Sequence, residues 1–263
     1  MSYYVHDLSP MALSYGPFIL PWYWLAYIAG FFVVYFGFIS LVKNKRTELS
    51  AKFIHTFLSR GFLCLVAGGR VGYILIYNLS YYLSNPQKIL AVWEGGMSFH
   101  GAVLGVFFYS LYISKKKQIS LYDLTDPISI WAPLGLFFGR MANFMNGELA
   151  GRVTDVPWAV VFPKFYGSEP RHPSQIYEAL IEGILVFIIM FLISKKKLDQ
   201  RGFCSGLFLA LYGVGRFFVE FFRNPDPQLG LFFDFFTLGQ IFCLAMILLG
   251  GVIIAKSINR VER

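Results

Sequence analysis

Long apolar stretches separated by short polar connections dominate the chain. A helix needs about 20 mostly apolar residues to cross the roughly 30 Å hydrocarbon core of a bilayer. Seven stretches meet this requirement, near residues 18–42, 54–77, 98–114, 121–141, 174–194, 203–222 and 234–255. The fourth is interrupted by Asp126, Pro127 and Pro133. The pattern predicts an all-α polytopic membrane protein with seven transmembrane helices. We expect a single integral membrane domain over residues 1–263, whose main outer segment is 142–173.

Composition supports this class and excludes others. Hydrophobic residues make up 56% of the 263 positions and charged residues only 14%, against about 25% charged residues in a typical soluble domain. The three cysteines, Cys64, Cys204 and Cys243, all lie in apolar stretches and lack metal-ligand spacing. We interpret them as buried thiols, so the sequence indicates neither a metal nor a soluble cofactor.

The net charge of +8 is distributed unevenly among the connections. One alternate set of connections (43–53, 115–120, 195–202 and the tail from 256) holds 14 of the 23 Lys and Arg residues, and the other set holds five. Because cytoplasmic connections carry the excess of basic residues, the N-terminus is predicted outside and the C-terminus in the cytoplasm. No Lys or Arg precedes Lys43, so no cleavable signal peptide is predicted. The basic balance therefore reflects orientation and does not indicate nucleic acid as a partner.

Pairs of glycines spaced four residues apart recur in the apolar stretches. They are Gly68/Gly72, Gly101/Gly105, Gly135/Gly139 and Gly202/Gly206. This spacing leaves a flat stripe on a helix that lets another backbone approach closely. We interpret the pairs as helix-packing positions.

Polar residues at membrane depth are costly and mark candidate functional sites. The densest group runs from Gly139 to Arg152, at the outer end of the fourth stretch. The Arg140 guanidinium could bind phosphate oxygens bidentately. The amides of Asn143 and Asn146 and the carboxylate of Glu148 could position hydroxyl groups. The alternative is a helix end whose arginine only reaches to the outer interface.

A second group lies between Tyr212 and Asp226. One helix face should carry Tyr212, Arg216 and Glu220, because these residues are spaced four apart in the sequence. The spacing allows an Arg216–Glu220 ion pair. Glu220 could orient the arginine and leave donors available for a phosphate, or the two could neutralise each other inside the bundle.

Three further features face the same predicted side. His100 follows Gly95 and Gly96 at the outer mouth of the third stretch and could move a proton near neutral pH. The run 171–178 is interpreted first as the capped start of the fifth stretch, with Pro173 in its first turn, and otherwise as a substrate contact. The run 22–24, which contains Tyr23, fits an aromatic belt or a contact with a lipid headgroup.

At these motifs the sequence resembles the bacterial prolipoprotein diacylglyceryl transferases. The similarity follows the chain in order through Tyr23, Gly69–Tyr73, Gly95–Gly101, Gly139–Thr154, Arg171–Tyr177, Tyr212–Asp226 and Leu238–Gln240. The resemblance implies a seven-span enzyme of the bacterial inner membrane, with its active site toward the outer leaflet. It also implies that the diacylglyceryl group of phosphatidylglycerol moves to the lipobox cysteine thiol of a prolipoprotein, and that glycerol phosphate leaves. The implied essential residues are His100, Arg140 and Arg216. Residues implied in binding or activity are Tyr23, Asn143, Asn146, Glu148, Gly151, Tyr212 and Glu220.

These residue types suit that chemistry. The substrate protein supplies the nucleophile, so no enzyme cysteine needs to be exposed. Arg140 and Arg216 could stabilise the charge that develops on the departing phosphate. His100 is the candidate acceptor of the thiol proton, and a tyrosine is the competing candidate.

Two other classes of protein could carry some of these features. A lipid or small-anion transporter could also bury arginines near a phosphate site, but no inverted repeat is visible and the ionisable groups gather toward one leaflet. A purely structural membrane scaffold does not account for Arg140 together with Asn143, Asn146 and Glu148.

Overall fold

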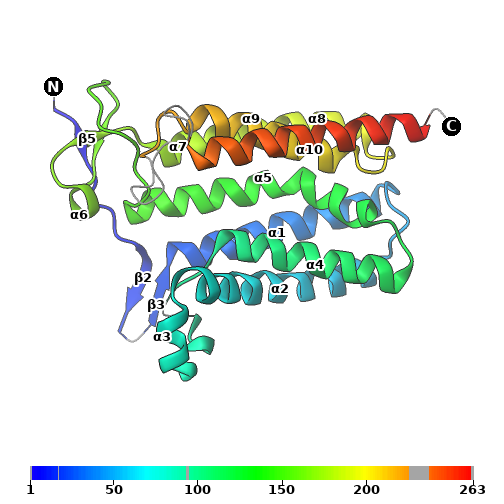
Figure 1. Cartoon of the computed structure of the whole chain (residues 1–263), viewed down its shortest axis with the longest axis horizontal. Coiled ribbons are helices and arrows are strands. Elements are labelled where there is room, and N and C mark those ends of the chain that lie inside the picture. The colour runs from blue at the N-terminus through cyan, green and yellow to red at the C-terminus, as the bar shows by residue number, and fades with distance from the viewer. Residues whose placement is uncertain (1, 17, 93–94, 225–236, 262–263) are drawn as a thin grey trace. The chain divides into compact units, whose positions relative to one another are not determined.

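The computed structural model describes residues 2–16, 18–92, 95–224 and 237–261. Helices dominate, and short strands occur near the N-terminus and in the segment between α5 and α7 (Figure 1). The helices are α1 (Trp22–Lys43), α2 (Ala51–Tyr77), α3 (Leu79–Ser84), the 3-10 helix η1 (Pro86–Leu90), α4 (Phe99–Lys117), α5 (Leu121–Asn146), α6 (Pro163–Tyr166), α7 (Ser174–Glu178), the π-helix η3 (Ala179–Leu185), α8 (Val186–Lys197), α9 (Phe203–Val219) and α10 (Leu238–Val261). The strands are β1 (Tyr4–Val5), β2 (Met11–Tyr15), β3 (Phe18–Pro21), β4 (Val160–Val161) and β5 (Pro170–Arg171).

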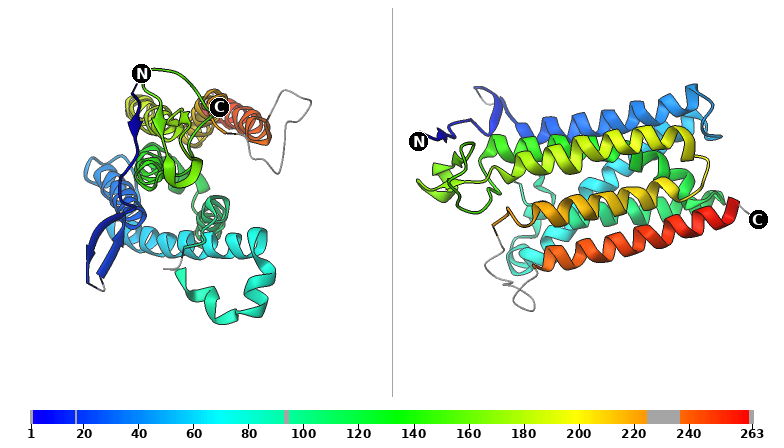
Figure 2. Two further views of the ribbon diagram at one scale, coloured as in Figure 1. Left: turned by 90° about the vertical axis from the view of Figure 1, so that its left-hand side faces the viewer. Right: turned by 90° about the horizontal axis from the view of Figure 1, so that it is seen from above.

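The chain forms two compact units. Unit 1 comprises Met1–Gly37 and Asp126–Arg263, and unit 2 comprises Phe38–Thr125. Within unit 1, α8, α9 and α10 run alongside one another, and α9 packs against both neighbours (Figures 1 and 2). Strand β1 lies at one end of these helices and the C-terminal end of α10 at the other (Figure 1). Within unit 2, α2 packs along α4.

Four described helices are long and apolar enough to cross a membrane. They are Trp22–Lys43, Ala51–Tyr77, Ser174–Lys197 and Leu238–Asn259, and Phe203–Val219 is an apolar but shorter helix. Helices α4 and α5 occupy the third and fourth predicted stretches without being among these four. Residues 234–236 of the seventh predicted stretch lie outside the described residues. The helices are those of a membrane protein.

The bounds of two helices differ from the predicted stretches for local reasons. Helix α1 begins at Trp22 and not at residue 18, because 18–21 form β3, which pairs antiparallel with β2. Helix α5 continues through both prolines to Asn146, five residues beyond the predicted end. Prolines are tolerated inside membrane helices when neighbouring groups satisfy the backbone that they free. The polar motif that begins at Gly139 is therefore helical up to Asn146.

Asp126 caps another helix. Its carboxylate accepts hydrogen bonds from the Gly202 amide at 2.6 Å and from the Ser205 amide and hydroxyl at 2.7 and 2.6 Å. These amides lie at the start of α9, where the first backbone N–H groups have no partner within the helix. Asp126 is 2% exposed, so this buried carboxylate ties α5 to the N-terminus of α9.

The glycine pairs have the predicted packing role in two helix contacts. A Cβ added to Gly68 would lie 2.4 Å from the Gly101 carbonyl oxygen, so only glycine permits the approach of α2 to α4. Likewise, a Cβ on Gly206 would lie 2.8 Å from the Gly250 carbonyl oxygen, where α9 meets α10. The prediction is wrong for Gly139, because a Cβ there would meet no described atom within 4 Å.

The outer segment folds against the N-terminus. Strand β4 pairs in parallel with β1 and antiparallel with β5. His6 is 6% exposed, and its Nε2 lies 2.7 Å from the Phe144 carbonyl oxygen at the end of α5. The His6 ring packs against buried Phe162, which clusters with Val160 and Ala150. This small core fixes the path of the segment that follows α5.

The cysteine prediction holds for two of the three thiols. Cys204 and Cys243 are buried, whereas Cys64 is half-buried. Among the described residues, no cluster of His, Cys, Asp and Glu is arranged to hold a metal ion.

Candidate active site

Three arginines and three glutamates meet inside unit 1. The arginines are Arg140 on α5, Arg216 on α9 and Arg223 just beyond α9; the glutamates are Glu178 at the end of α7, Glu182 in η3 and Glu220 at the end of α9. The described side chains of this cluster carry balanced formal charge. Counter-ions of this kind allow charged groups to persist at membrane depth.

Glu178 lies at the centre of the cluster. Its Oε2 is 2.8 Å from Arg140 Nε and 3.4 Å from Arg216 Nη1, and its Oε1 accepts a hydrogen bond from Arg223 Nη1 at 2.5 Å. The side chain is 1% exposed. One buried carboxylate therefore sets the distance between three guanidinium groups from three segments of the chain.

The predicted Arg216–Glu220 ion pair is confirmed, with Arg216 Nη2 2.6 Å from Glu220 Oε2. Glu220 also accepts a hydrogen bond from the Thr237 hydroxyl at 3.1 Å. A Cβ on Gly239 would lie 3.0 Å from Glu220 Oε1, so the glycine at the start of α10 leaves room for this carboxylate. Thr237 and Gln240 exchange hydrogen bonds in a capping box that begins α10.

Glu182 is the loosest member of the cluster. It is fully buried, yet its oxygens lie 3.8 Å from Arg140 Nη2 and 3.9 Å from Arg216 Nη1. Neither oxygen has a hydrogen-bond partner among the described residues, and the same is true of Arg216 Nη1. Glu182 sits in a π-helix, and such segments occur frequently at functional sites.

The roles of Glu178 and Glu182 were not predicted from the sequence. We interpreted Glu178 as part of a helix start and did not single out Glu182. The available signal was their i, i+4 spacing inside an otherwise apolar stretch, which places two carboxylates on one helix face.

A second group of predicted residues meets next to Arg140. The Tyr23 hydroxyl donates a short hydrogen bond to Glu148 Oε1, and Asn143 Nδ2 donates to the Tyr23 hydroxyl and, at 2.8 Å, to Glu148 Oε1. Arg140 interacts electrostatically with Tyr23 and also with Tyr212. Arg140 therefore connects this triad to the carboxylate cluster, and four predicted site residues lie around it: Tyr23, Asn143, Glu148 and Tyr212.

The other predicted binding residues of unit 1 have different surroundings. Asn146 Oδ1 is buried without a hydrogen-bond partner among the described residues. Gly151 packs so tightly that a Cβ would lie 2.3 Å from the Phe222 carbonyl oxygen, and its amide donates to His172 O at 2.8 Å. Gly151 thus joins the outer segment to the chain after α9. Pro225 and Asp226, the last residues of the second motif, lie outside the described residues.

The run 171–178 differs from the predicted helix cap. Pro173 occupies the N-cap position of α7, outside its first turn, and makes no side-chain cap. Instead, Ser174 Oγ donates to the Leu149 carbonyl oxygen at 3.0 Å and Gln175 Nε2 donates to the Glu148 carbonyl oxygen at 2.6 Å. Leu149 itself has a positive φ of 59°. These buried side chains hold the irregular backbone that presents Glu148.

His100 belongs to unit 2, so its place beside the arginines of unit 1 stays a prediction. It is exposed in the first turn of α4, where the Ser98 hydroxyl caps the helix by accepting from Gly101 N at 3.3 Å.

The loop before α4 is held by Arg70, which is 4% exposed. The Arg70 guanidinium donates to backbone carbonyls at 2.5–3.1 Å, those of Lys88, Ile89, Ala91, Gly95 and Gly96. From the sequence, Arg70 falls only within the run Gly69–Tyr73, which predicts no separate role for it.

Comparison with known proteins identifies the family of the chain. Residues 10–256 match the family model described as prolipoprotein diacylglyceryl transferase. The chain is 45% identical over 243 residues to the phosphatidylglycerol–prolipoprotein diacylglyceryl transferase of Geobacter sulfurreducens, covering 92% of this chain and 93% of the relative. It is 43% identical to the protein of that name from Nitratidesulfovibrio vulgaris (92% of each chain) and 42% identical to that from Aeromonas hydrophila (97% and 92%). The chain therefore belongs to the prolipoprotein diacylglyceryl transferase family.

Proposed function

We propose that this protein transfers the sn-1,2-diacylglyceryl group of phosphatidylglycerol to the lipobox cysteine of a prolipoprotein. The cysteine sulfur forms a bond to the carbon of the diacylated glycerol that carries the phosphate. The bond between that carbon and the phosphate oxygen breaks. The departing glycerol phosphate takes the electron pair, and the thiol proton passes to a base. Family membership, together with two half-buried arginines beside a polar triad, supports this reaction over lipid or anion transport.

The observation that carries the proposal is the arrangement of Arg140 and Arg216 around Glu178. Both guanidiniums contact one carboxylate oxygen, at 2.8 and 3.4 Å, so they face a common point. Arg216 Nη1 is buried and makes no hydrogen bond to any described residue. A phosphate oxygen beside Glu178 would gain a donor from Arg216 Nη1 and lie near the Arg140 guanidinium, in a medium of low dielectric, where such interactions are strong.

The weak contacts of Glu182 suit this role. Because its oxygens lie nearly 4 Å from Arg140 and Arg216, the arginines can turn toward a phosphate without breaking a short bond to Glu182. The ion pairs with Glu178 and Glu220 would keep the two arginines in place. We assign phosphate binding and leaving-group stabilisation to Arg140 and Arg216, with Glu220 orienting Arg216 and Tyr212 lying against Arg140.

Tyr23, Asn143 and Glu148 form the polar wall next to this point. Their mutual hydrogen bonds fix the three groups, and we assign them to the glycerol hydroxyls of the headgroup. Asn146, with an unsatisfied buried oxygen, is a further acceptor for a hydroxyl, and Gly151 keeps the outer segment in place. We assign the thiol proton to His100, with Tyr23 as the alternative acceptor.

The proposed setting is the bacterial inner membrane, with seven spans, an outer N-terminus and a cytoplasmic C-terminus. Helices α1, α4 and α8 each carry lysine in their last turn, and β1 and the end of α10 lie at opposite ends of unit 1. The substrate proteins would present their lipobox cysteine from the outer leaflet. Reporter fusions after residues 47, 118, 199 and 259 should all report the cytoplasm; an external signal from any of them would contradict this topology.

The decisive experiment uses purified protein, phosphatidylglycerol labelled in both its acyl and headgroup parts, and a lipobox peptide. The acyl label should move to the peptide through a thioether, and the headgroup label should appear as glycerol phosphate in equal amount. Transfer of neither label, or movement of intact lipid between leaflets without transfer, would overturn the proposal.

A further inference from the structure

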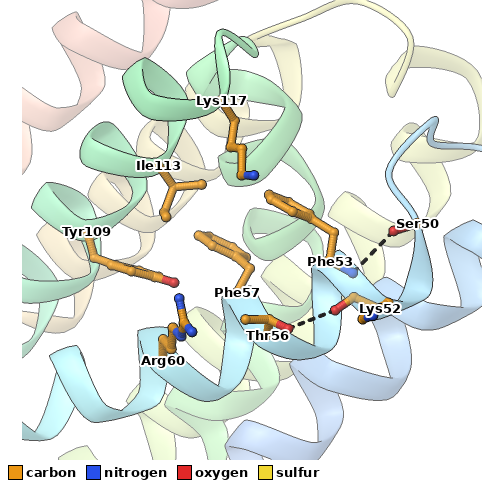
Figure 3. A pocket seen from close by; sticks show the side chains of 9 residues that line it. All are labelled: Ser50, Lys52, Phe53, Thr56, Phe57, Arg60, Tyr109, Ile113 and Lys117. Carbon is orange, nitrogen blue, oxygen red and sulfur yellow. Dashed lines mark hydrogen bonds between the residues drawn. The ribbon is translucent and has the colours of Figure 1, made fainter.

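A cavity of about 310 Å³ lies in unit 2 between the first turns of α2 and the last turns of α4 (Figure 3). It is lined by residues of both helices and by Ser50, which caps α2. The proposed transfer reaction uses none of its lining residues.

One wall of this cavity is a stack of aromatic rings. The rings of Phe53 and Phe57 are parallel, with centroids 6.1 Å apart and an interplanar angle of 1°. Phe57 stacks in turn on Tyr109 of α4, with centroids 5.4 Å apart and an angle of 13°. Phe57 is 2% exposed, so this wall is rigid and apolar.

Three cations surround the apolar wall. Lys52 and Arg60 stand eight residues apart on α2, and Lys117 ends α4. In the part of the chain that the structure describes, none of the three forms an ion pair, and no carboxylate lines the cavity. Figure 3 shows the Arg60 guanidinium beside the Tyr109 hydroxyl, and the two groups interact electrostatically. In contrast, the three arginines of the unit 1 cluster, Arg140, Arg216 and Arg223, each pair with a glutamate.

We propose that this cavity binds the headgroup of an anionic glycerophospholipid of the cytoplasmic leaflet. The three cations complement the lipid phosphate, and the aromatic wall accommodates its glycerol and the start of its acyl chains. A free phosphate would leave that wall without a partner, which favours a lipid. Basic pockets between membrane helices on the cytoplasmic side bind such headgroups. The inference rests on the proposed orientation, which places the loops at 43–53 and 115–120 in the cytoplasm, but not on the transfer chemistry.

The test is photo-crosslinking of the full-length protein in phosphatidylcholine vesicles that contain phosphatidylglycerol with a diazirine in its acyl chain. Adducts are mapped by peptide mass spectrometry. We expect labelling within 50–60 and 109–117, reduced by unlabelled phosphatidylglycerol but not by inorganic phosphate. In the variant Lys52→Gln/Arg60→Gln/Lys117→Gln, the affinity at these peptides should fall about a hundredfold, since each basic group near a membrane contributes about fivefold. The control Lys115→Gln/Lys116→Gln/Lys196→Gln removes equal charge and should retain the labelling.

Three outcomes would overturn the inference. They are equal labelling by a phosphatidylcholine probe, equal competition by inorganic phosphate, and unchanged labelling in the Lys52/Arg60/Lys117 variant. Absence of labelling of the unaltered protein, with normal diacylglyceryl transfer, would contradict only this inference. Normal labelling without transfer would contradict only the proposed reaction.

Discussion

Arg140 Nε lies 2.8 Å from Glu178 Oε2, and that carboxylate also holds Arg216 and Arg223. Removing the charge from Glu178 would leave three half-buried guanidiniums with one counter-ion fewer. Breaking a buried ion pair in this way costs about 3–5 kcal/mol. We therefore expect Glu178→Gln to lower the free energy of unfolding by that amount in detergent.

Glu182→Gln is the matched comparison for Glu178→Gln, because both replace a buried carboxylate by an amide of the same shape. Glu182 has only contacts near 4 Å, so its replacement should destabilise the protein much less. Equal destabilisation by both variants would show that Glu178 has no central role.

Arg216→Lys tests whether the geometry of the guanidinium matters. Lysine keeps the charge but cannot contact Glu178 and Glu220 while still offering a donor to phosphate. We expect kcat for diacylglyceryl transfer to fall on the order of 100-fold or more, with a smaller change in KM. Arg152→Lys, at an exposed arginine of the outer segment, should stay near the wild-type rate. A near-normal rate for Arg216→Lys would rule out bidentate binding.

Tyr23 and Asn143 should act as a unit, because both side chains bond to each other and to Glu148. Either Tyr23→Phe or Asn143→Ala alone disrupts the triad. We expect the double variant to lose less activity than the two single losses combined, with a coupling of about 0.5–3 kcal/mol in activation free energy. Simple additivity of kcat/KM in this double-mutant cycle would mean that the two residues contribute separately.

Asp126→Asn should affect stability and leave catalysis intact. The carboxylate accepts three hydrogen bonds at the start of α9, and an amide NH₂ would face donors there. Because hydrogen bonds to a charged group contribute about 1.5–3 kcal/mol each, we expect a clear loss of thermal stability, with unchanged kcat for the folded fraction. Asp199→Asn, at an exposed position, serves as the control. A catalytic defect without loss of stability would contradict the capping role.

His172 should make the outer segment sensitive to acid. Burial lowers the pKa of His172 below its ordinary value of 6.5, and the ring contacts Tyr177 and Phe222. A lowered pKa in the folded state means that stability is complete above about pH 6.5 and decreases as the pH falls below it. Hydrogen exchange at the amides of residues 150–154 should therefore show weaker protection at acidic pH. His172→Gln should flatten this dependence, and an unchanged profile in that variant would assign it to another group.

The helical class and the position of the main polar motifs follow from local properties of the chain. Three features depend only on helix geometry, which fixes which residues share a face. They are the length of the apolar stretches, the glycine spacing in α2 and α4, and the i, i+4 pair of Arg216 and Glu220. Arg140 could also be singled out from the sequence, because a charge within an apolar stretch needs a partner or a function.

The identity of the partners was decided by tertiary structure. Which carboxylate faces Arg140 depends on how α5, α7 and α9 are rotated and packed, and Glu178 lies 38 residues from Arg140 in the chain. The same holds for Tyr23 with Asn143, and for Gln175 with the backbone of Glu148. These contacts join distant segments, so no local spacing specifies them. They form because buried polar groups must find partners once the helices have packed.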